Sequence, residues 1–329
     1  MKTLSRISES AGSEKKLKVV FFGLGSIGLK LARLIRDNFN HSIYAFRATK
    51  NSPNNPGIHE VYELNGLKHL APDVAFITNP TSLHIDTAIQ SATLGMHLFI
   101  EKPLCNRLDK WEPLRKTVQE KQIISYVGCN MRFDPMIQYL KQSLNPDKIF
   151  YSRVVCSSYL PDWRPDQDYK NSYSGRKELG GGVILDLIHE PDYCHWLFGP
   201  ISKINGNAGK CSHLEIETED FADMNLHHSS GFLSNIHLNY FGRKLQRKIE
   251  IFGDNFYIEA DLIERTVITV NKEGKDIRKF APIDRDYTYE EELKYFFQCL
   301  SDHKVPMNNI EEHRTVLKPV LEFKENLGL

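Results

Sequence analysis

The chain has 329 residues, enough for two domains, and its composition is that of an ordinary globular protein. Its 42 Lys and Arg residues balance 42 Asp and Glu residues, so the charge suggests neither nucleic acid nor an anionic membrane as a partner. No apolar run could span a bilayer, and the six scattered cysteines form no Cys-x-x-Cys pair, which argues against a disulfide framework or a zinc site. A reducing cytoplasm is therefore the expected location.

The N-terminal region combines a polar stretch with a glycine motif. Residues 1–16 are predicted to be a flexible leader. The apolar run 17–22 predicts a strand, and it leads into Gly23-Leu24-Gly25-Ser26-Ile27-Gly28 and then an amphipathic helix. In such a unit Gly23 allows the tight turn, Gly25 lets a pyrophosphate approach the backbone, and Gly28 lets helix pack on strand. We therefore predict a dinucleotide site that includes Ser26 and Ile27.

The second predicted strand, Ser42–Phe46, bears on the choice of cofactor. NAD-binding proteins usually place Asp or Glu at the end of this strand to bind the ribose 2′-hydroxyl, whereas this chain has Arg47. A guanidinium could pair with a 2′-phosphate, helped by Thr49 and Lys50, or could stack on the adenine and leave the choice open. The expected cofactor is NADP or NAD, with NADP favoured.

The third predicted strand, Asp73–Thr78, ends in a turn that is followed by a helix over 85–94. Its end, like the glycine motif, should face a bound ligand. The residues assigned to the cofactor site here are Thr78, Asn79, Pro80 and His84. For His84, simple capping or packing is an equal alternative.

A strand over 96–100 stops at Glu101-Lys102-Pro103, because proline cannot donate to a sheet ladder. Ligands bind outside the carboxyl ends of the strands in an open α/β sheet, so Glu101 and Lys102 should lie at the ligand. The alternative is a solvated surface pair. With a helix over 111–121 and a strand over 123–127, the alternation predicts a doubly wound parallel Rossmann sheet over residues 17–130.

The remainder, 131–329, is predicted to be a substrate and oligomerisation domain built on a largely antiparallel open sheet with helices on one face. Its expected strands are Phe150–Ser158, Phe221–His227, Phe232–Tyr240, Gln246–Phe252, Phe256–Asp261 and Arg265–Asn271. Helices are expected over 289–301 and 310–325, and the last can pack back on the first domain. We expect a homodimer or homotetramer formed through this sheet.

Before most of these strands lies a glycine-rich segment, 180–193, in which three glycines open a helix and Pro191 predicts a kink or an early break. If the segment is one helix, Asp186, His189, Glu190 and Tyr193 share a face. Ionisable groups on an otherwise apolar helix are costly to bury without a purpose, although a capping or surface stripe is an alternative. A metal site is not assigned, since no second ligand cluster is evident.

These motifs together carry a family resemblance. In Gly23–Gly28, Asp73–His84, Glu101-Lys102-Pro103 and Gly180–Gly199, the chain resembles the glucose-fructose oxidoreductase / inositol dehydrogenase (Gfo/Idh/MocA) family. The resemblance implies hydride transfer between a nicotinamide cofactor and a secondary alcohol or ketone of a sugar or sugar derivative, such as a sugar nucleotide. It also implies that Asp186 and His189 face Lys102. The gap between those two residues is one residue shorter than usual, so Glu190 or Asp192 could share the role of Asp186.

Chemistry suggests roles for the catalytic candidates. His189 can take the hydroxyl proton, Lys102 can stabilise the developing alkoxide, and Asp186 can orient either group. Lys102 is an equally good candidate for the base. A binding or regulatory protein that senses a dinucleotide without turnover is the competing class, but the presence of both Lys102 and His189 favours an enzyme.

The segment Trp163–Arg176 is rich in aromatic, cationic and amide groups, which suit an anionic sugar, although an ordinary surface loop is the alternative. No nucleic acid, membrane or metal partner is expected. The residues assigned to the substrate are Arg132, Trp163, Arg164, Tyr169, Tyr173 and Glu190.

Overall fold

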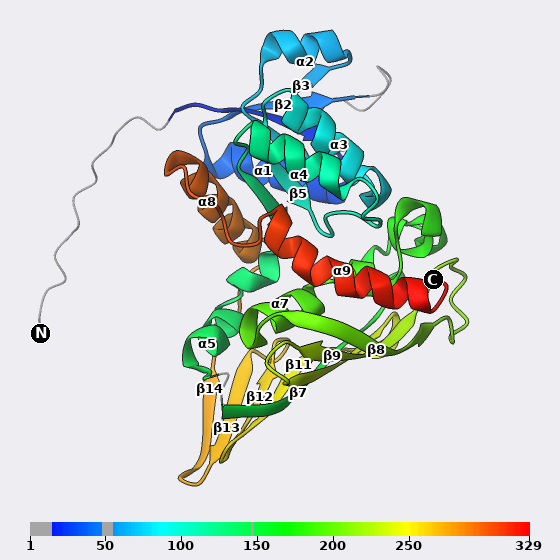
Figure 1. Ribbon diagram of the computed structural model, residues 1–329, viewed down its shortest axis with the longest axis vertical. Coiled ribbons are helices and arrows are strands. Elements are labelled where there is room, and N and C mark those ends of the chain that lie inside the picture. The colour runs from blue at the N-terminus through cyan, green and yellow to red at the C-terminus, as the bar shows by residue number, and fades with distance from the viewer. Residues whose placement is uncertain (1–14, 48–54, 146–147) are drawn as a thin grey trace, which may run out of the picture.

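The computed structural model of the protein describes residues 15–47, 55–145 and 148–329. The expected leader, 1–16, therefore lies almost wholly outside the described residues, and Thr49 and Lys50 lie outside them as well. The described chain forms two sheets, one at each end of the molecule, with helices around and between them (Figure 1).

The first sheet is a six-stranded parallel sheet in the order β3-β2-β1-β4-β5-β6, which confirms the predicted Rossmann architecture. Its central strands are almost uniformly apolar because helices cover both faces. The strands are β1 (Lys18–Phe22), β2 (Ser42–Phe46), β3 (His59–Val61), β4 (Val74–Ile77), β5 (His97–Glu101) and β6 (Ser125–Gly128). The short β3 escaped prediction because its three residues, His-Glu-Val, carry no apolar alternation.

The helices on this sheet come from both ends of the chain. The helices that connect its strands are α1 (Ser26–Asn38), α2 (Leu64–Leu70), α3 (Thr81–Thr93) and α4 (Trp111–Glu120). A later helix, α8 (Tyr287–Ser301), packs beside α1, and its Phe296 ring lies 5.4 Å from that of Phe99 (Figure 1). The first domain is thus completed by a helix that follows all strands of the second sheet in sequence.

The second sheet has eight strands in the order β14-β13-β12-β11-β7-β10-β9-β8, and neighbours are antiparallel except for the parallel pair β7 and β10. This confirms a largely antiparallel open sheet. The strands are β7 (Ile149–Tyr159), β8 (Ile201–Gly209), β9 (Phe221–His228), β10 (Leu233–Asn239), β11 (Phe241–Gly253), β12 (Phe256–Asp261), β13 (Thr266–Asn271) and β14 (Gly274–Lys279). The edge strands β8 and β14 were not predicted, and every residue of β14 is exposed, so it has no buried face to pattern it.

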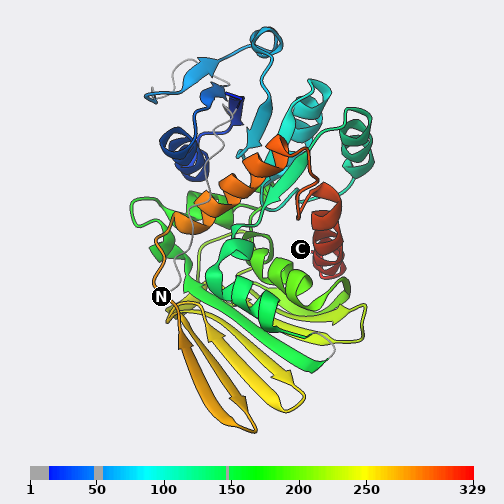
Figure 2. The same ribbon diagram turned by 90° about the vertical axis from the view of Figure 1, so that its left-hand side faces the viewer.

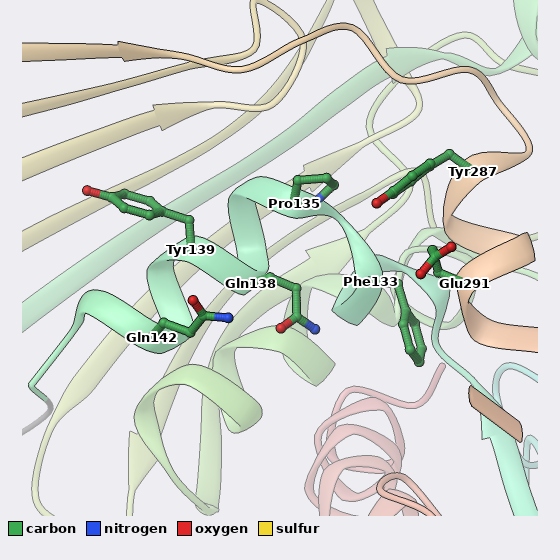
Figure 3. A pocket seen from close by; sticks show the side chains of 7 residues that line it. All are labelled: Phe133, Pro135, Gln138, Tyr139, Gln142, Tyr287 and Glu291. Atoms are coloured by element: carbon green, nitrogen blue, oxygen red, sulfur yellow. The ribbon is translucent and has the colours of Figure 1, made fainter. Parts of the chain in front are cut away.

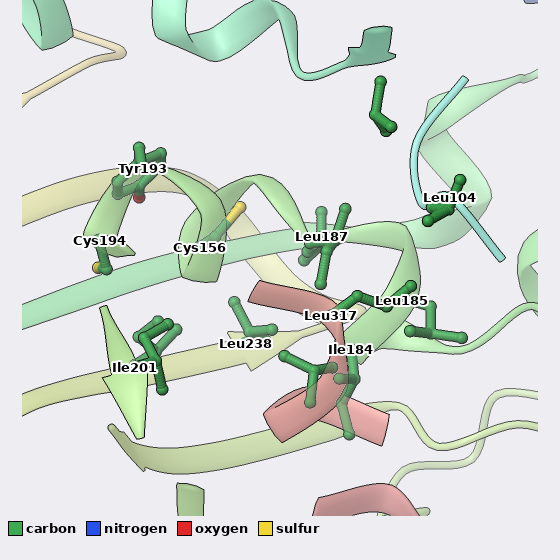
Figure 4. Close-up of a cluster of buried hydrophobic side chains, with 14 of the residues drawn as sticks. Leu104, Cys156, Ile184, Leu185, Leu187, Tyr193, Cys194, Ile201, Leu238 and Leu317 are labelled. Atoms are coloured by element: carbon green, nitrogen blue, oxygen red, sulfur yellow. The ribbon is translucent and has the colours of Figure 1, made fainter. Parts of the chain in front are cut away.

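One face of the second sheet carries the helices (Figures 1 and 2). These are α5 (Pro135–Ser143), α6 (Val183–Asp186), α7 (His189–Phe198) and α9 (Ile310–Asn326). Figure 4 shows Ile184 of α6 and Leu187 of the turn after it in a buried apolar cluster with Leu238 of β10 and Leu317 of α9. This packing holds the glycine-rich segment between the second sheet and the first domain.

Two features of the described chain concern its environment. All six cysteines are free, and five of them are buried. Within the described ranges, no helix combines the length and the apolar character needed to cross a bilayer.

Candidate functional site

A cavity of about 580 Å³ opens where the carboxyl ends of the first sheet's strands meet the second domain. The first domain contributes the glycine turn, the ends of β4 and β5, and Lys30 of α1, while the second domain contributes Asp186 and the loop after β7. Its lining residues are Gly23, Gly25, Ser26, Ile27, Lys30, Thr78, Asn79, Pro80, Thr81, His84, Glu101, Lys102, Arg164, Gln167, Tyr173, Asp186 and Tyr289. Most residues assigned to the cofactor from sequence therefore line one space.

The glycine turn has the shape that a diphosphate requires. A Cβ on Gly23 would lie 2.6 Å from the backbone nitrogen of Asn79, and one on Gly28 would lie 2.3 Å from the oxygen of Gly23. Gly23 also has φ +102°, which side-chain-bearing residues rarely adopt. A Cβ on Gly25 would instead meet open space, since no heavy atom lies within 4 Å of it. The turn is thus crowded by backbone atoms at Gly23 and Gly28 and open at Gly25. The open side has room for a dinucleotide phosphate at the start of α1.

His84 braces the neighbouring turns. Its two ring nitrogens each lie 2.8 Å from a backbone oxygen, of Pro103 and of Asn79. Burial lowers the pKa of His84, although both carbonyl contacts act to raise it. This ring therefore fixes the end of β4 against the Lys102-Pro103 turn, which favours packing over direct contact with a ligand.

Lys102 and Asp186 meet across the two domains. The Lys102 Nζ donates to the backbone oxygen of Asp186 at 2.5 Å and lies 3.5 Å from its Oδ1. The other carboxylate oxygen of Asp186 accepts from Ser174 Oγ at 2.5 Å and from Tyr240 OH at 2.9 Å. The aspartate is thus held by three groups, and it in turn fixes the lysine at the cavity wall.

Sequence reasoning missed Ser174 and Tyr240. Tyr240 is fully buried and follows β10, 54 residues after Asp186, while Ser174 lies in a short 3₁₀ turn. A serine in a loop and a tyrosine at a strand end carry no local pattern that would link them to a distant aspartate. Only the packing of β10 beneath α6 brings them together.

Glu101 lines the cavity next to Lys102 but is itself buried. Burial raises the pKa of Glu101 to about 7, and its Oε1 has no hydrogen-bond partner in the described structure. Burial and the charge of Glu101 also raise the pKa of Glu292, which accepts a hydrogen bond from Tyr126 at 2.9 Å. Both carboxyl groups are therefore shifted toward their neutral forms.

The glycine-rich segment is two helices and not one. It breaks at 187–188, between α6 and α7, so Asp186, His189 and Glu190 do not share a face. Pro191 stands in the first turn of α7, where its missing N–H costs no helical hydrogen bond, so the break precedes it. The shared-face interpretation required one continuous helix, and it was wrong because the helix is interrupted at 187–188.

His189 lies next to the site but does not line the cavity. Its ring is buried and makes no hydrogen bond within the described parts of the chain. Burial, followed by the charges of Lys102 and Arg247, lowers the pKa of His189 well below its ordinary value. The imidazole is therefore neutral at physiological pH.

Two residues assigned to the substrate lie elsewhere. Glu190 is fully buried and pairs with Arg247 at 2.6 Å. Arg132 is also fully buried: it makes two hydrogen bonds to Asp192, at 2.9 and 2.8 Å, and one to Glu312 at 2.6 Å. Glu190 thus joins α7 to β11, and Arg132 joins the 3₁₀ turn after β6 to α7 and α9. Both charges are neutralised in these ion pairs, and neither residue lines the cavity.

The loop after β7 contributes unevenly to the cavity. Arg164 and Tyr173 line it, and the Tyr173 hydroxyl joins the domains through Thr81 Oγ1 at 2.8 Å and the oxygen of Gly180 at 2.9 Å. Trp163 and Tyr169 line an adjoining small hollow that shares Arg164 with the main cavity. Of the four loop residues assigned to the substrate, two therefore line the main cavity and two line the hollow beside it.

Arg47 lies at the outer end of β2, away from the lining of the main cavity. Its Nε is 3.7 Å from Glu60 Oε1 on the neighbouring strand β3. Glu60 also accepts a hydrogen bond from Tyr62. A carboxylate therefore stands next to the arginine, which sequence reasoning missed because β3 itself was not predicted.

Cys129, Asp192 and His313 form a cluster whose ligand atoms lie within 4.8 Å of one another. Both oxygens of Asp192 already accept hydrogen bonds from Arg132, whose charge opposes a second cation. Burial also raises the pKa of the Cys129 thiol well above its ordinary value, which disfavours the thiolate that binds metals. This cluster is better explained as part of the buried network between α7 and α9.

A second hollow, of about 390 Å³, lies between α5 and the start of α8 (Figure 3). Aromatic and amide side chains dominate its lining, including Phe133, Tyr139 and Gln138. Its one charged lining residue, Glu291, pairs with Lys294 on the same helix. Its described lining includes no lysine, arginine, histidine or glycine turn, whereas the first cavity has all four, so the first cavity is the candidate site.

Two family models match the chain, one in each domain. A family model described as "Oxidoreductase family, NAD-binding Rossmann fold" matches residues 17–129, and a "GFO/IDH/MocA C-terminal domain" model matches residues 138–259. The chain is 25% identical over 276 residues to the myo-inositol 2-dehydrogenase of Thermotoga maritima, covering 78% of this chain and 80% of that protein. For two other curated relatives the aligned region spans only 41% and 34% of their length.

Solved structures show the same fold. The UDP-N-acetylglucosamine 3-dehydrogenase of Acidithiobacillus ferrooxidans superposes with a TM-score of 0.77 at 19% identity, over 94% of this chain and 97% of that one. The WlbA dehydrogenase of Bordetella pertussis, in complex with NADH and UDP-GlcNAcA, superposes with a TM-score of 0.76 at 19% identity, over 96% and 97%.

Proposed function

The chain belongs to the Gfo/Idh/MocA family of NAD-binding oxidoreductases, and from this premise we propose that it moves hydride between a nicotinamide cofactor and a secondary alcohol or ketone of a sugar-type substrate. The observation that carries the proposal is the Lys102–Asp186 contact, because both residues line the same cavity as the glycine turn. When bound, the nicotinamide supplies the hydride chemistry. The chain's own residues have to position the substrate and move its proton.

Lys102 is the residue best placed to act on the substrate oxygen. An ammonium at the cavity wall stabilises negative charge that develops on an alcohol oxygen, and it can pass a proton to or from that oxygen. Asp186 holds the ammonium in place, and Ser174 and Tyr240 hold Asp186. We propose this chain of contacts as the catalytic machinery, with His189 as the neutral base next to it.

The proposed substrate is an anionic sugar, such as a sugar nucleotide. Arg164 lines the cavity and, within the described residues, has no ion-pair partner, so its charge is available to a phosphate or carboxylate. Gln167 and Tyr173 add amide and hydroxyl groups next to it. Relatives whose names include UDP-N-acetylglucosamine 3-dehydrogenase support the same class.

The deciding experiment is turnover of NAD⁺ and NADP⁺ against polyols, aldoses and UDP-sugars. Lys102→Ala should abolish turnover with any substrate that the wild type oxidises, and should leave dinucleotide binding within about twofold. Near-normal kcat in this variant would remove Lys102 from the mechanism. Tight dinucleotide binding without turnover on any substrate would instead favour a dinucleotide-sensing protein.

For the cofactor we propose a preference for NADP(H), which rests on Arg47. Its guanidinium can pair with a 2′-phosphate, but the nearby Glu60 competes for that charge and could accept from ribose hydroxyls. Dissociation constants for NADH and NADPH should therefore be measured in wild type, Arg47→Ala and Glu60→Gln. The proposal requires NADPH to bind more tightly and Arg47→Ala to weaken NADPH alone. Tighter NADH binding that Glu60→Gln weakens would transfer the role to Glu60.

A further inference from the structure

Lys30 is a cavity-lining cation that the proposed mechanism does not use. It stands on α1, one turn beyond the glycine turn, and helical side chains point back toward the N-terminus of their helix. Lys30 thus lines the same cavity as Gly25 and Ser26, where a diphosphate would lie, and its flexible side chain starts on the next turn of the helix. The other two cations of the described lining have different positions: Lys102 is held by Asp186, and Arg164 belongs to the second domain.

The present partners of Lys30 all come from the start of α8. Its Nζ lies 3.0 Å from Asp286 Oδ1, 3.3 Å from the backbone oxygen of Arg285, and 4.7 Å from the centre of the Tyr289 ring. Tyr289 lines the same cavity. The lysine is thus held by the start of α8 while it lines the same cavity as the glycine turn.

Asp286 does not depend on Lys30 for charge balance. Arg33, one turn further along α1, contacts the other oxygen of Asp286 at 2.6 Å. Because one carboxylate faces two cations, it stays paired if Lys30 turns away. Both partners of the Lys30–Asp286 pair are also partly exposed, and such pairs contribute little, so an exchange costs little.

We propose that Lys30 is a ligand of the cofactor diphosphate, exchanging Asp286 for a phosphate oxygen when the dinucleotide binds while Arg33 keeps Asp286 paired. This inference rests on the proposed dinucleotide site. In this proposal the negative charge of the diphosphate is bound by a lysine of the second helical turn as well as by the backbone N–H groups of the glycine turn. It also means that α8, which follows the strands of the second sheet in sequence, sets the position of Lys30 before the cofactor binds.

The test compares Lys30→Met with Arg33→Met by calorimetric titration of three probes: adenosine, ADP, and whichever of NADH and NADPH the wild type prefers. Lys30→Met keeps the apolar stem and removes the charge. It should weaken ADP and dinucleotide binding about 10- to 100-fold, as expected for loss of a charge-assisted hydrogen bond, and leave adenosine unchanged. The salt dependence of ADP binding should also become shallower. Arg33→Met leaves Lys30 as the only one of these two cations beside Asp286, so it should weaken ADP and dinucleotide binding less than Lys30→Met does and leave adenosine binding unchanged.

Three results would overturn the inference. Unchanged ADP binding in Lys30→Met would mean that the backbone alone holds the phosphates. An equal loss of adenosine affinity would mean that Lys30 only supports the fold of the site. An equal effect of Arg33→Met would mean that both act through Asp286 and α8. Failure of the wild type to bind any dinucleotide would instead refute the proposed function itself, which separates the two outcomes.

Discussion

At the scale of single residues, the same desolvation acts in opposite directions on neighbouring groups of this site. Burial lowers the pKa of His189 and raises that of Glu101, so both groups are pushed toward their neutral forms beside the Lys102 ammonium. The candidate site therefore concentrates its charge on Lys102 and on Asp186, which hydroxyl donors stabilise. This is the division between acid and base roles that proton transfer near neutral pH requires.

The lowered pKa of His189 predicts a pH profile. A base must be unprotonated to act, so kcat/KM for alcohol oxidation should fall on the acid side only below about pH 6.5, the ordinary histidine value. His189→Gln should lower kcat and remove that acid limb. A profile whose acid limb survives in the variant would assign the base to Lys102.

The free charge of Arg164 predicts a substrate effect. Arg164→Ala should raise KM for a UDP-sugar by about tenfold or more, because a charge-assisted hydrogen bond is lost, and should change KM for an uncharged sugar little. Arg176→Ala is the matched control, since Arg176 lies in the same loop but pairs with Glu178 outside the cavity lining. An unchanged KM for both substrates in Arg164→Ala would make the loop a scaffold.

At the scale of elements, the last helix holds the start of α6 in position. Lys324 of α9 pairs with Glu219 at 2.5 Å, and both side chains are almost fully buried. Glu219 also accepts from the backbone nitrogen of Ile184 at 3.4 Å and lies where a Cβ on Gly182 would be. The short helix that ends in Asp186 is thus anchored by an ion pair from a distant part of the chain.

This anchor predicts a stability effect with a rescue. Lys324→Met leaves the Glu219 carboxylate buried and unpaired, which should reduce the free energy of unfolding by about 3 kcal/mol. Adding Glu219→Gln should recover much of that loss, because no unpaired buried charge then remains. Urea denaturation of the three proteins measures both effects. Equal stability of Lys324→Met and wild type would contradict a role for this pair.

At the scale of the whole molecule, one face of the second sheet is free of helices (Figures 1 and 2), and it carries a row of apolar and aromatic side chains. The row follows the strand register through Leu233, Tyr151, Phe252, Tyr257 and Val270. Neighbouring rings are in contact, with centroids 6.0 and 5.2 Å apart. Leu233, Phe252 and Val270 are each more than a third exposed, so we propose that a second copy of the chain covers this face.

This proposal predicts that charge on the face dissociates the assembly. Phe252→Glu should shift sedimentation toward the monomer, because a buried unpaired carboxylate opposes association. Ile263→Glu, at a similarly exposed residue in the turn after β12, should sediment like the wild type. A wild type that is monomeric at every concentration tested would refute the proposed interface.

Sequence patterns gave reliable predictions where the cause of structure is local. The glycine turn between β1 and α1, the end of β5 at Lys102-Pro103 and the alternation of strands and helices all follow from backbone sterics and short-range periodicity. Pro191 likewise predicted a kink or break in the glycine-rich segment, and the helix is interrupted just before α7. The strands that were missed, β3, β8 and β14, lie at the edges of the two sheets, where partial burial leaves little apolar alternation.

By itself the sequence determined the fold class, the dinucleotide turn and the candidacy of Lys102, because each depends on residues close together in the chain, whereas Asp186 was assigned through the family resemblance, with Glu190 and Asp192 left open. Only the tertiary structure decided which polar groups share a cavity. It directed Arg132 and Glu190 into buried ion pairs, and it brought Ser174 and Tyr240 to Asp186 and Lys30 to the cavity edge. The physical reason is that a charged side chain takes whichever partner the packed elements place beside it, and those partners here lie tens to hundreds of residues away.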